Sequence, residues 1–281
     1  MRQSIDPSRL NKLSYASRKP PEFMSFELLA CNGCETVYAS SGPPPEALAR
    51  AYHEAQYDSA EEAQLAADTY EHALSPFLAR LPSRTRALEI GTGTGVFLSA
   101  LKRAGFAETV GVEPSHAAVE AADPEIKSSI REGIFVEEDF EPESFELICC
   151  FQTLEHVPNP RQLVESSARL LRKGGLLALV THDYRAPLNR ILGRRSPIID
   201  VEHLQLFCRA SLERLLSSAG LDVSSIQSIS NRYPLKYWLR LAPLPSPLKS
   251  PIARALDALG MEKLRLSVNV GNLVSIARKT R

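Results

Sequence analysis

Short apolar runs alternate with amphipathic stretches from about residue 86 to the end of the sequence. The apolar runs predict strands at 87–90, 109–113, 134–136, 145–151 and 176–181, with two later strands near 222–230 and 265–278. The amphipathic stretches predict helices at 96–104, 160–171 and 210–219. Strands that alternate with helices predict an α/β fold, in which a parallel sheet carries helices on both faces.

The first 80 residues follow a different pattern. Residues 1–45 lack periodicity and contain the breakers Pro20-Pro21 and Pro43-Pro44-Pro45. Residues 46–80 read as helical, and their second half is rich in Ala and Glu, which favour helices. We therefore expect a small N-terminal appendage, residues 1–45, ahead of one larger domain, residues 46–281.

A glycine-rich turn, Glu89-Ile90-Gly91-Thr92-Gly93-Thr94-Gly95, joins the strand at 87–90 to its helix. Glycine permits positive φ angles and lets a ligand approach the backbone closely. Nucleotide, flavin and nicotinamide sites all use such turns, but the dinucleotide fingerprint is G-x-G-x-x-G, whereas this turn reads G-x-G-x-G. Glu113 ends the next strand, where a carboxylate can accept hydrogen bonds from both hydroxyls of a ribose. Together these features predict a nucleoside-containing ligand.

Two further segments follow strands at the edge of the sheet where such a ligand would lie. Glu138-Asp139-Phe140 follows the third predicted strand, where an acid can meet an adenine amino group and an aromatic ring can pack on the base. Gln152-Thr153-Leu154-Glu155-His156-Val157 follows the fourth, beside the far end of the ligand.

The segments L-E-I-G-T-G-T-G, V-E-P-S, E-E-D-F and L-E-H-V-P-N-P resemble, in this order, the motif series of class I S-adenosylmethionine-dependent methyltransferases. The resemblance covers about residues 86–182 and extends loosely to Val270-Gly271-Asn272-Leu273, which suits the final antiparallel strand of that family. It implies a Rossmann-like, mostly parallel seven-stranded sheet and S-adenosylmethionine as the cofactor.

The same resemblance assigns roles to individual residues. The three glycines would line the methionine part of the cofactor, Glu113 would hold the ribose, Asp139 and Phe140 would flank the adenine, and Gln152 and Leu154 would pack near the sulfonium. The implied cofactor-binding residues are Glu89, Gly91, Gly93, Gly95, Glu113, Asp139, Phe140, Gln152 and Leu154.

Methyl transfer from a sulfonium needs in-line positioning and, for a hydroxyl acceptor, a general base. Our candidates are His203, then His182 with Asp183, because both segments follow predicted strands or precede a helix at the active-site edge. His156 is expected to have a structural role. We predict methyl transfer from S-adenosylmethionine to a small-molecule acceptor, with oxygen as the expected acceptor atom. The alternatives are a nicotinamide-dependent oxidoreductase and a non-catalytic cofactor-binding scaffold.

Cys31-Asn32-Gly33-Cys34 resembles half of a zinc ribbon, which some methyltransferases carry ahead of the catalytic domain. A closed structural zinc site needs four ligands, and residues 1–30 contain neither Cys nor His. The sequence therefore predicts a degenerate ribbon that binds no metal. Cys149 and Cys150 lie inside a predicted strand and are expected in the core.

Residues 184–281 carry 16 Lys and Arg against 6 Asp and Glu. Arg232, Lys236 and Arg240 recur at a spacing of four residues, which after Pro234 would place the cations on one helix face and apolar residues on the other. We interpret 231–262 as an insertion that forms a lid over the substrate, with a membrane-surface helix as the alternative.

Composition narrows the function further. The chain has 281 residues and equal numbers of acidic and basic residues, 33 each, which argues against a wholly basic nucleic-acid binder. Residues 46–146 carry 8 Lys and Arg against 20 Asp and Glu, so the cofactor half is acidic and the other half basic. We therefore expect an acceptor that is anionic or lipid-linked, and no nucleic-acid substrate. Peripheral contact with an anionic membrane surface is a further hypothesis. The absence of a signal-like apolar start and the five cysteines favour a cytoplasmic location, and the oligomeric state stays undetermined.

Overall fold

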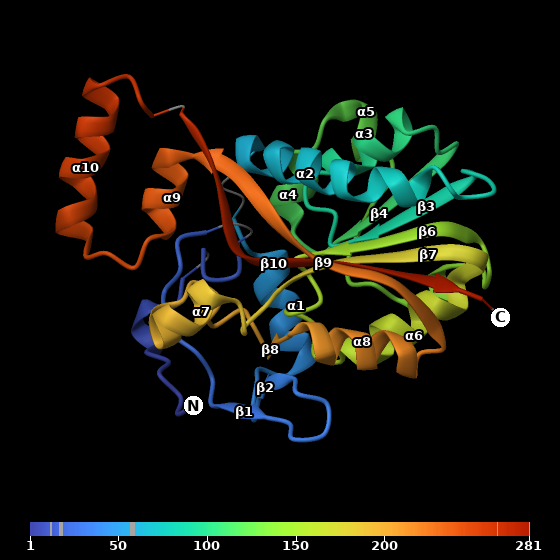
Figure 1. Cartoon of the computed structure of the whole chain (residues 1–281), viewed down its shortest axis with the longest axis horizontal. Coiled ribbons are helices and arrows are strands. Elements are labelled where there is room, and N and C mark those ends of the chain that lie inside the picture. Colours follow the sequence, from blue (N-terminus) through green and yellow to red (C-terminus); the bar gives the residue numbers. More distant parts are fainter. Residues whose placement is uncertain (12, 17–18, 57–59, 263, 281) are drawn as a thin grey trace.

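The computed structural model describes residues 1–11, 13–16, 19–56, 60–262 and 264–280. Its centre is a seven-stranded sheet with the order β5-β4-β3-β6-β7-β10-β9 (Figure 1). The strands are β3 (Arg86–Ile90), β4 (Glu108–Glu113), β5 (Ile130–Glu132), β6 (Phe145–Phe151), β7 (Leu171–His182), β9 (Leu221–Pro234) and β10 (Arg265–Lys279). β3 to β7 run parallel, and β10 pairs antiparallel with both β7 and β9. The predicted α/β fold is confirmed.

Helices cover both faces of this sheet (Figure 1). α2 (Ala60–Leu78) and α3 (Val96–Arg103) lie on one face, and α6 (Pro160–Leu170) and α8 (Arg209–Ser218) lie on the other. Successive side chains of a strand point to opposite faces, so the sheet has two apolar cores. Cys149 belongs to the core under α2 and α3, and Cys150 to the core under α6 and α8, as expected for core cysteines. The shorter helices are α1 (Pro45–His53), α4 (His116–Glu120), α5 (Pro124–Lys127) and α7 (Pro187–Leu192), with 3-10 turns at Pro7–Arg9, Glu137–Asp139 and Gly193–Arg195.

The third strand lies earlier than the sequence pattern predicts. We expected it at 134–136, but β5 is Ile130–Glu132 and pairs with Gly111, Val112 and Glu113 of β4. Ile134 and Val136 are 59% and 37% exposed, so their apolar character does not mark a buried strand. The loop that follows β5 consequently begins at Gly133.

The N-terminal segment forms a hairpin that is joined to the larger domain. β1 (Leu28–Ala30) and β2 (Val37–Ala39) pair antiparallel, and β2 also pairs with β8 (Gln205–Leu206). Cys31 and Cys34 lie in the hairpin turn, where the Cys34 N–H donates to Cys31 Sγ over 3.5 Å. Among the described residues, no group of three or more His, Cys, Asp or Glu side chains is arranged to hold a metal ion.

A helical arm extends from the edge of the sheet between β9 and β10 (Figure 1). It consists of α9 (Leu235–Leu241) and α10 (Ser246–Ala258), so the helix expected after Pro234 is confirmed. Arg232, which we expected on the same helix face as Lys236 and Arg240, lies instead in β9, before Pro234. Lys236 of α9 forms a 2.7 Å ion pair with Asp257 of α10. Of the helices in the described part of the chain, none has both the length and the apolar character needed to cross a bilayer.

Candidate active site

A cavity of about 770 Å³ opens at the carboxyl ends of the parallel strands. β3 ends before Gly91, β4 ends at Glu113, β6 ends before Gln152 and β7 ends at His182, and all four residues line the cavity. Ligands of open α/β sheets bind at this edge, where the strand order reverses. The neighbours of β3 are β4 on one side and β6 on the other, so the reversal lies at the glycine turn.

The glycine turn leaves its backbone open to a ligand. Gly91 has φ of +75°, and a Cβ at this position would lie 2.2 Å from Thr153 Oγ1, so only glycine fits. The Gly91 N–H donates to the Val112 carbonyl over 2.8 Å, which fixes the turn on β4. The Gly93 N–H donates to Glu113 Oε2 over 2.7 Å. The turn and the acid at the end of β4 therefore form one unit.

Two buried carboxyl groups lie beside this turn. Glu113 accepts a second hydrogen bond, from the Ser115 N–H over 2.9 Å, and burial raises the pKa of its carboxyl. Glu89 accepts from Thr92 Oγ1 over 2.5 Å. Both acids line the cavity, so their oxygens lie where polar groups of a ligand can be held.

Gln152 is strained and incompletely bonded. Its φ of +52° is in the left-handed region, which side chains other than glycine seldom adopt. Its Nε2 atom is buried without a hydrogen-bond partner in the described structure, although the side chain lines the cavity. Backbone strain of this kind is typical of functional sites, and an unused buried donor fits a site that is completed by a polar ligand.

Five predicted site residues lie away from the cavity lining. Gly95 caps α3 with φ of +73°, and Leu154 is fully buried in the core under α6. Asp183 Oδ1 accepts from the Arg185 N–H over 2.8 Å beside a separate shallow depression. The other two are Asp139 and Phe140.

Asp139 and Phe140 are displaced because β5 lies earlier than expected. Phe140 is buried against Phe145, with ring centroids 5.6 Å apart. The cavity is lined instead by Gly133 to Glu138, the residues directly after β5. A base that packs at this edge would therefore meet the loop at Ile134 to Glu138 rather than Asp139 and Phe140.

Three histidines from three segments meet in the lining of the cavity. His156 follows β6, His182 ends β7, and His203 precedes β8. The rings of His156 and His203 have centroids 4.8 Å apart, and those of His182 and His203 are 5.3 Å apart. All three line the cavity, so His156, for which we expected a structural role, belongs to the same cluster.

These histidines are uncharged at neutral pH. Burial lowers the pKa of His156 and of His182 to about 4 and lowers the pKa of His203 well below its ordinary value. His203 Nδ1 lies 3.0 Å from the Ile198 carbonyl, and His182 Nδ1 lies 2.8 Å from Asn272 Oδ1. Both partners are acceptors, so Nδ1 carries the proton in each ring and Nε2 is left as an acceptor.

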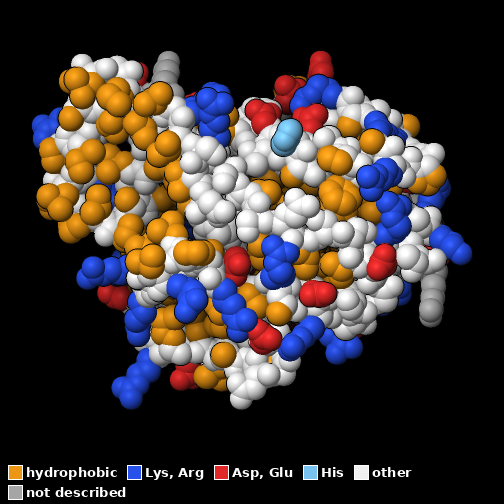
Figure 2. Space-filling model, in the orientation of Figure 1, with side chains coloured by type: hydrophobic (Ala, Val, Ile, Leu, Met, Phe, Trp, Pro, Cys, Tyr) orange, Lys and Arg blue, Asp and Glu red, His pale blue; other side chains and the backbone are white. Residues whose placement is uncertain are grey.

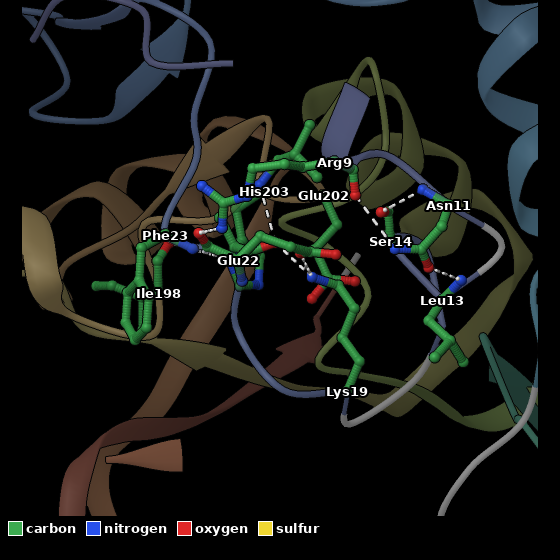
Figure 3. Close-up of polar contacts among 12 residues, drawn as sticks. Arg9, Asn11, Leu13, Ser14, Lys19, Glu22, Phe23, Ile198, Glu202 and His203 are labelled. Atoms are coloured by element: carbon green, nitrogen blue, oxygen red, sulfur yellow. Dashed lines mark hydrogen bonds and ion pairs between the residues drawn. The ribbon is translucent and has the colours of Figure 1, made fainter. Parts of the chain in front are cut away.

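A buried group of charges borders the histidines (Figure 3). Lys19 reaches from the N-terminal segment towards the loop that carries Glu202 and His203, and pairs with Asp200 over 2.5 Å and with Glu22. Burial raises the pKa of Asp200 to about 7 and of Glu202 to about 8. The sequence pattern gave no indication of Lys19, because it lies in an irregular segment 181 residues from its partner Asp200.

Aromatic residues complete the cavity. Tyr52 of α1 lies with its hydroxyl 3.0 Å from His156 Nδ1. Helix α9 of the arm contributes part of the cavity wall through Tyr237, Trp238 and Leu241. The cavity therefore combines uncharged histidines with aromatic side chains and with the buried charges around Lys19.

Comparison with known proteins identifies the family. The model of the methyltransferase domain family matches residues 45–226. The chain belongs to this family. Together with the glycine-turn motifs, this makes it an S-adenosylmethionine-dependent methyltransferase, and the alternatives of a nicotinamide-dependent oxidoreductase and a non-catalytic scaffold are set aside.

Individual relatives agree with the family assignment. The chain is 30% identical over 182 residues to the ubiquinone biosynthesis O-methyltransferase of Paracidovorax citrulli, covering 56% of this chain and 74% of that protein. It is 26% identical over 159 residues to the protein of the same name from Neisseria meningitidis, covering 52% of this chain and 67% of that protein.

Solved structures share the fold of this methyltransferase. The YcgJ protein of Bacillus subtilis superposes with a TM-score of 0.52 at 21% identity, covering 75% of this chain and 99% of that one. A SAM-dependent methyltransferase from Archaeoglobus fulgidus gives a TM-score of 0.52 at 16% identity, covering 76% and 94% of the two chains.

Proposed function

We propose that this methyltransferase methylates a hydroxyl oxygen of a small, largely apolar acceptor. The observation that carries the proposal is the cluster of uncharged histidines, His156, His182 and His203, in the lining of the cavity. A neutral imidazole can take the proton that a hydroxyl must lose. The names of the two relatives, both O-methyltransferases of ubiquinone biosynthesis, support oxygen as the acceptor atom.

Glu89, Gly91, Gly93, Glu113 and Gln152 are the residues that we propose to hold the cofactor. S-adenosylmethionine supplies a methyl group that is already activated on a sulfonium. The open turn at Gly91 and Gly93 would accommodate its methionine part, Glu113 its ribose, and the unpaired Gln152 amide one of its polar groups. Gly95 and Leu154 would act indirectly, by fixing α3 and the core beneath the site.

His203 and His182 are the proposed general bases. In each ring the Nδ1 proton is held by an acceptor, so Nε2 is free to receive the hydroxyl proton. The imidazole would thereby take up the hydroxyl proton, and the cofactor, when bound, would supply the methyl group to the acceptor oxygen. Asp183, which we also predicted to be catalytic, lies on the other side of the backbone and is no part of this proposal.

The charge of the acceptor needs revision. We expected an anionic acceptor from the basic second half of the sequence. Among the described residues that line the cavity, the lysine is Lys19, and it is already paired with Asp200 and Glu22. An additional negative charge would lie close to Asp200 and Glu202, so we now favour an uncharged hydroxylated ring as the acceptor group.

Turnover of histidine variants tests the proposal. We expect His203→Ala to lower methyl transfer to a panel of hydroxylated ring compounds at least about tenfold, while S-adenosylmethionine affinity in calorimetry stays nearly unchanged. His182→Ala should act in the same direction. His116→Ala is the matched control, because His116 lies on the surface and pairs with Glu132. Unchanged turnover of both cavity variants would remove the histidines from the mechanism.

The pH dependence separates a histidine base from a carboxylate base. Because the pKa of His182 is about 4, kcat should be level between about pH 6 and pH 8. Ionisation of Glu202, whose pKa is about 8, would instead make kcat rise steeply over the same range. Such a rise would assign the base to Glu202.

A further inference from the structure

The helical arm, α9 and α10, leaves an apolar surface uncovered. No described side chain of α10 is buried. Figure 2 shows apolar side chains gathered over this part of the molecule, with Lys and Arg side chains at its rim. The large apolar residues that are exposed on the arm and its connections are Leu244, Leu248, Ile252, Leu259, Met261 and Leu264.

Helix geometry places three of these exposed residues on one face of the arm. Leu248, Ile252 and Leu259 are separated by 4 and 7 positions, which in an α-helix puts their side chains within about 40° of one another. They are 53%, 42% and 71% exposed. A contiguous apolar stripe of this kind on an exposed helix marks an interaction surface rather than scattered surface residues.

The charge around the stripe is strongly positive. Residues 231–265 carry 7 Lys and Arg against 2 Asp and Glu, whereas residues 46–146 carry 8 against 20. Arg232 and Arg254 are exposed and have no ion-pair partner among the described residues. Two copies of this chain that met through the stripe would bring their cations together, so a second copy is a poor occupant. An apolar stripe on an arm with this excess of positive charge is complementary to an anionic bilayer surface.

One side of the arm already contacts the rest of the protein. Tyr237, Trp238 and Leu241 of α9 line the active-site cavity, and Trp238 Nε1 donates to the Leu266 carbonyl over 2.9 Å. The arm therefore has one side against the cavity and a free apolar side on α10. A surface that holds α10 would lie next to the cavity wall.

We propose that the arm docks on an anionic phospholipid bilayer, with Leu248, Ile252 and Leu259 in the interface and the excess positive charge of residues 231–265 attracted to the lipid headgroups. The enzyme would then work as a peripheral protein at a membrane surface. This inference does not depend on the acceptor or on the histidine base.

Vesicle flotation of the full chain tests the proposal. We expect binding to vesicles with about 30% phosphatidylglycerol at about 0.05 M salt, weaker binding at about 0.5 M salt, and little binding to phosphatidylcholine alone. The variant L248Q/I252Q/L259Q should lower affinity at least about tenfold, because it removes the apolar stripe with residues that favour helices. R232Q/R254Q should lower affinity about tenfold at low salt only.

Leu29→Gln is the matched control, because Leu29 is 41% exposed, like Ile252, but lies on the hairpin strand β1. The control should float like the unaltered chain, and the melting temperature of every variant should confirm that it is folded. Absence of binding to anionic vesicles, or equal binding by the glutamine variant, would overturn the proposal. A concentration-dependent dimer that the glutamine variant dissolves, without any vesicle binding, would assign the surface to a second copy.

Discussion

Glu155 offers a direct test of how burial governs the ionisation of this site. Its side chain is fully buried, Oε1 accepts from the His182 N–H over 2.6 Å, and Oε2 has no hydrogen-bond partner in the described structure. Burial raises the pKa of this carboxyl from 4.5 to about 7. Between these two values the unfolded chain is ionised while the folded protein keeps its proton. The stability that is present below pH 4.5 is therefore lost as the pH rises to about 7.

The gap between the two pKa values corresponds to about 3 kcal/mol of unfolding free energy. Glu155→Gln has the same shape, keeps an oxygen for the His182 N–H and cannot ionise, so it should escape this loss. The free energy of unfolding of the variant, relative to that of the unaltered protein, should therefore increase by about 2–3 kcal/mol from pH 5 to pH 8. Urea unfolding at both pH values, followed by far-UV circular dichroism, measures the difference.

The comparison is internal, because a buried acid that does not interact with Glu155, such as Asp200, contributes equally to both proteins. Glu141→Gln, at an exposed position, is the control and should show no pH-dependent gain. A gain of less than about 1 kcal/mol for Glu155→Gln would show that Glu155 is ionised at neutral pH in the folded protein, against the argument from burial.

Two further substitutions test the turn and the buried ion pair. Gly91→Ala should weaken S-adenosylmethionine binding at least about tenfold in calorimetry, because the new Cβ would collide with Thr153. Gly174→Ala is the control. Gly174 has a similar positive φ, but a Cβ there would have no atom within 4 Å, so this variant should bind the cofactor normally. Lys19→Met should lower the free energy of unfolding at pH 8 by about 3 kcal/mol, because it leaves Asp200 buried without its cation. The exposed Lys173→Met should change it little in the same urea titration, and an equal result for both lysines would contradict the role of burial.

The position of the glycine turn and of Glu113 in the cavity lining was predictable because their signals are local. The glycine turn and Glu113 each follow directly from a strand that the hydrophobic pattern identifies, and the parallel fold brings strand ends together. The error at the third strand has a physical cause. Ile134 and Val136 are apolar because they line a cavity, and the pattern alone does not distinguish an apolar residue facing a ligand from one facing the core.

The histidine cluster and the residues around it were less predictable because they are assembled from distant segments. His182 and His203 could be proposed from their places beside strand and helix boundaries, but Lys19 and Tyr52 come from stretches with no strand or motif to position them. His156 and Tyr52 meet across 104 residues of sequence. Their contact depends on how α1 packs against the loop that follows β6, which the local pattern does not encode.

The place of β10 in the sheet has a consequence for the order in which the enzyme is assembled. β10 is the last strand in the sequence, yet it lies between β7 and β9. As the polypeptide emerges from the ribosome, β3 to β7 can pair as soon as they are made, whereas β9 must wait for residues 265–279 to join it to the sheet. The strand ends that carry the glycine turn and Glu113 can therefore form early in synthesis, and the part of the cavity wall from α9 is among the last parts to be secured.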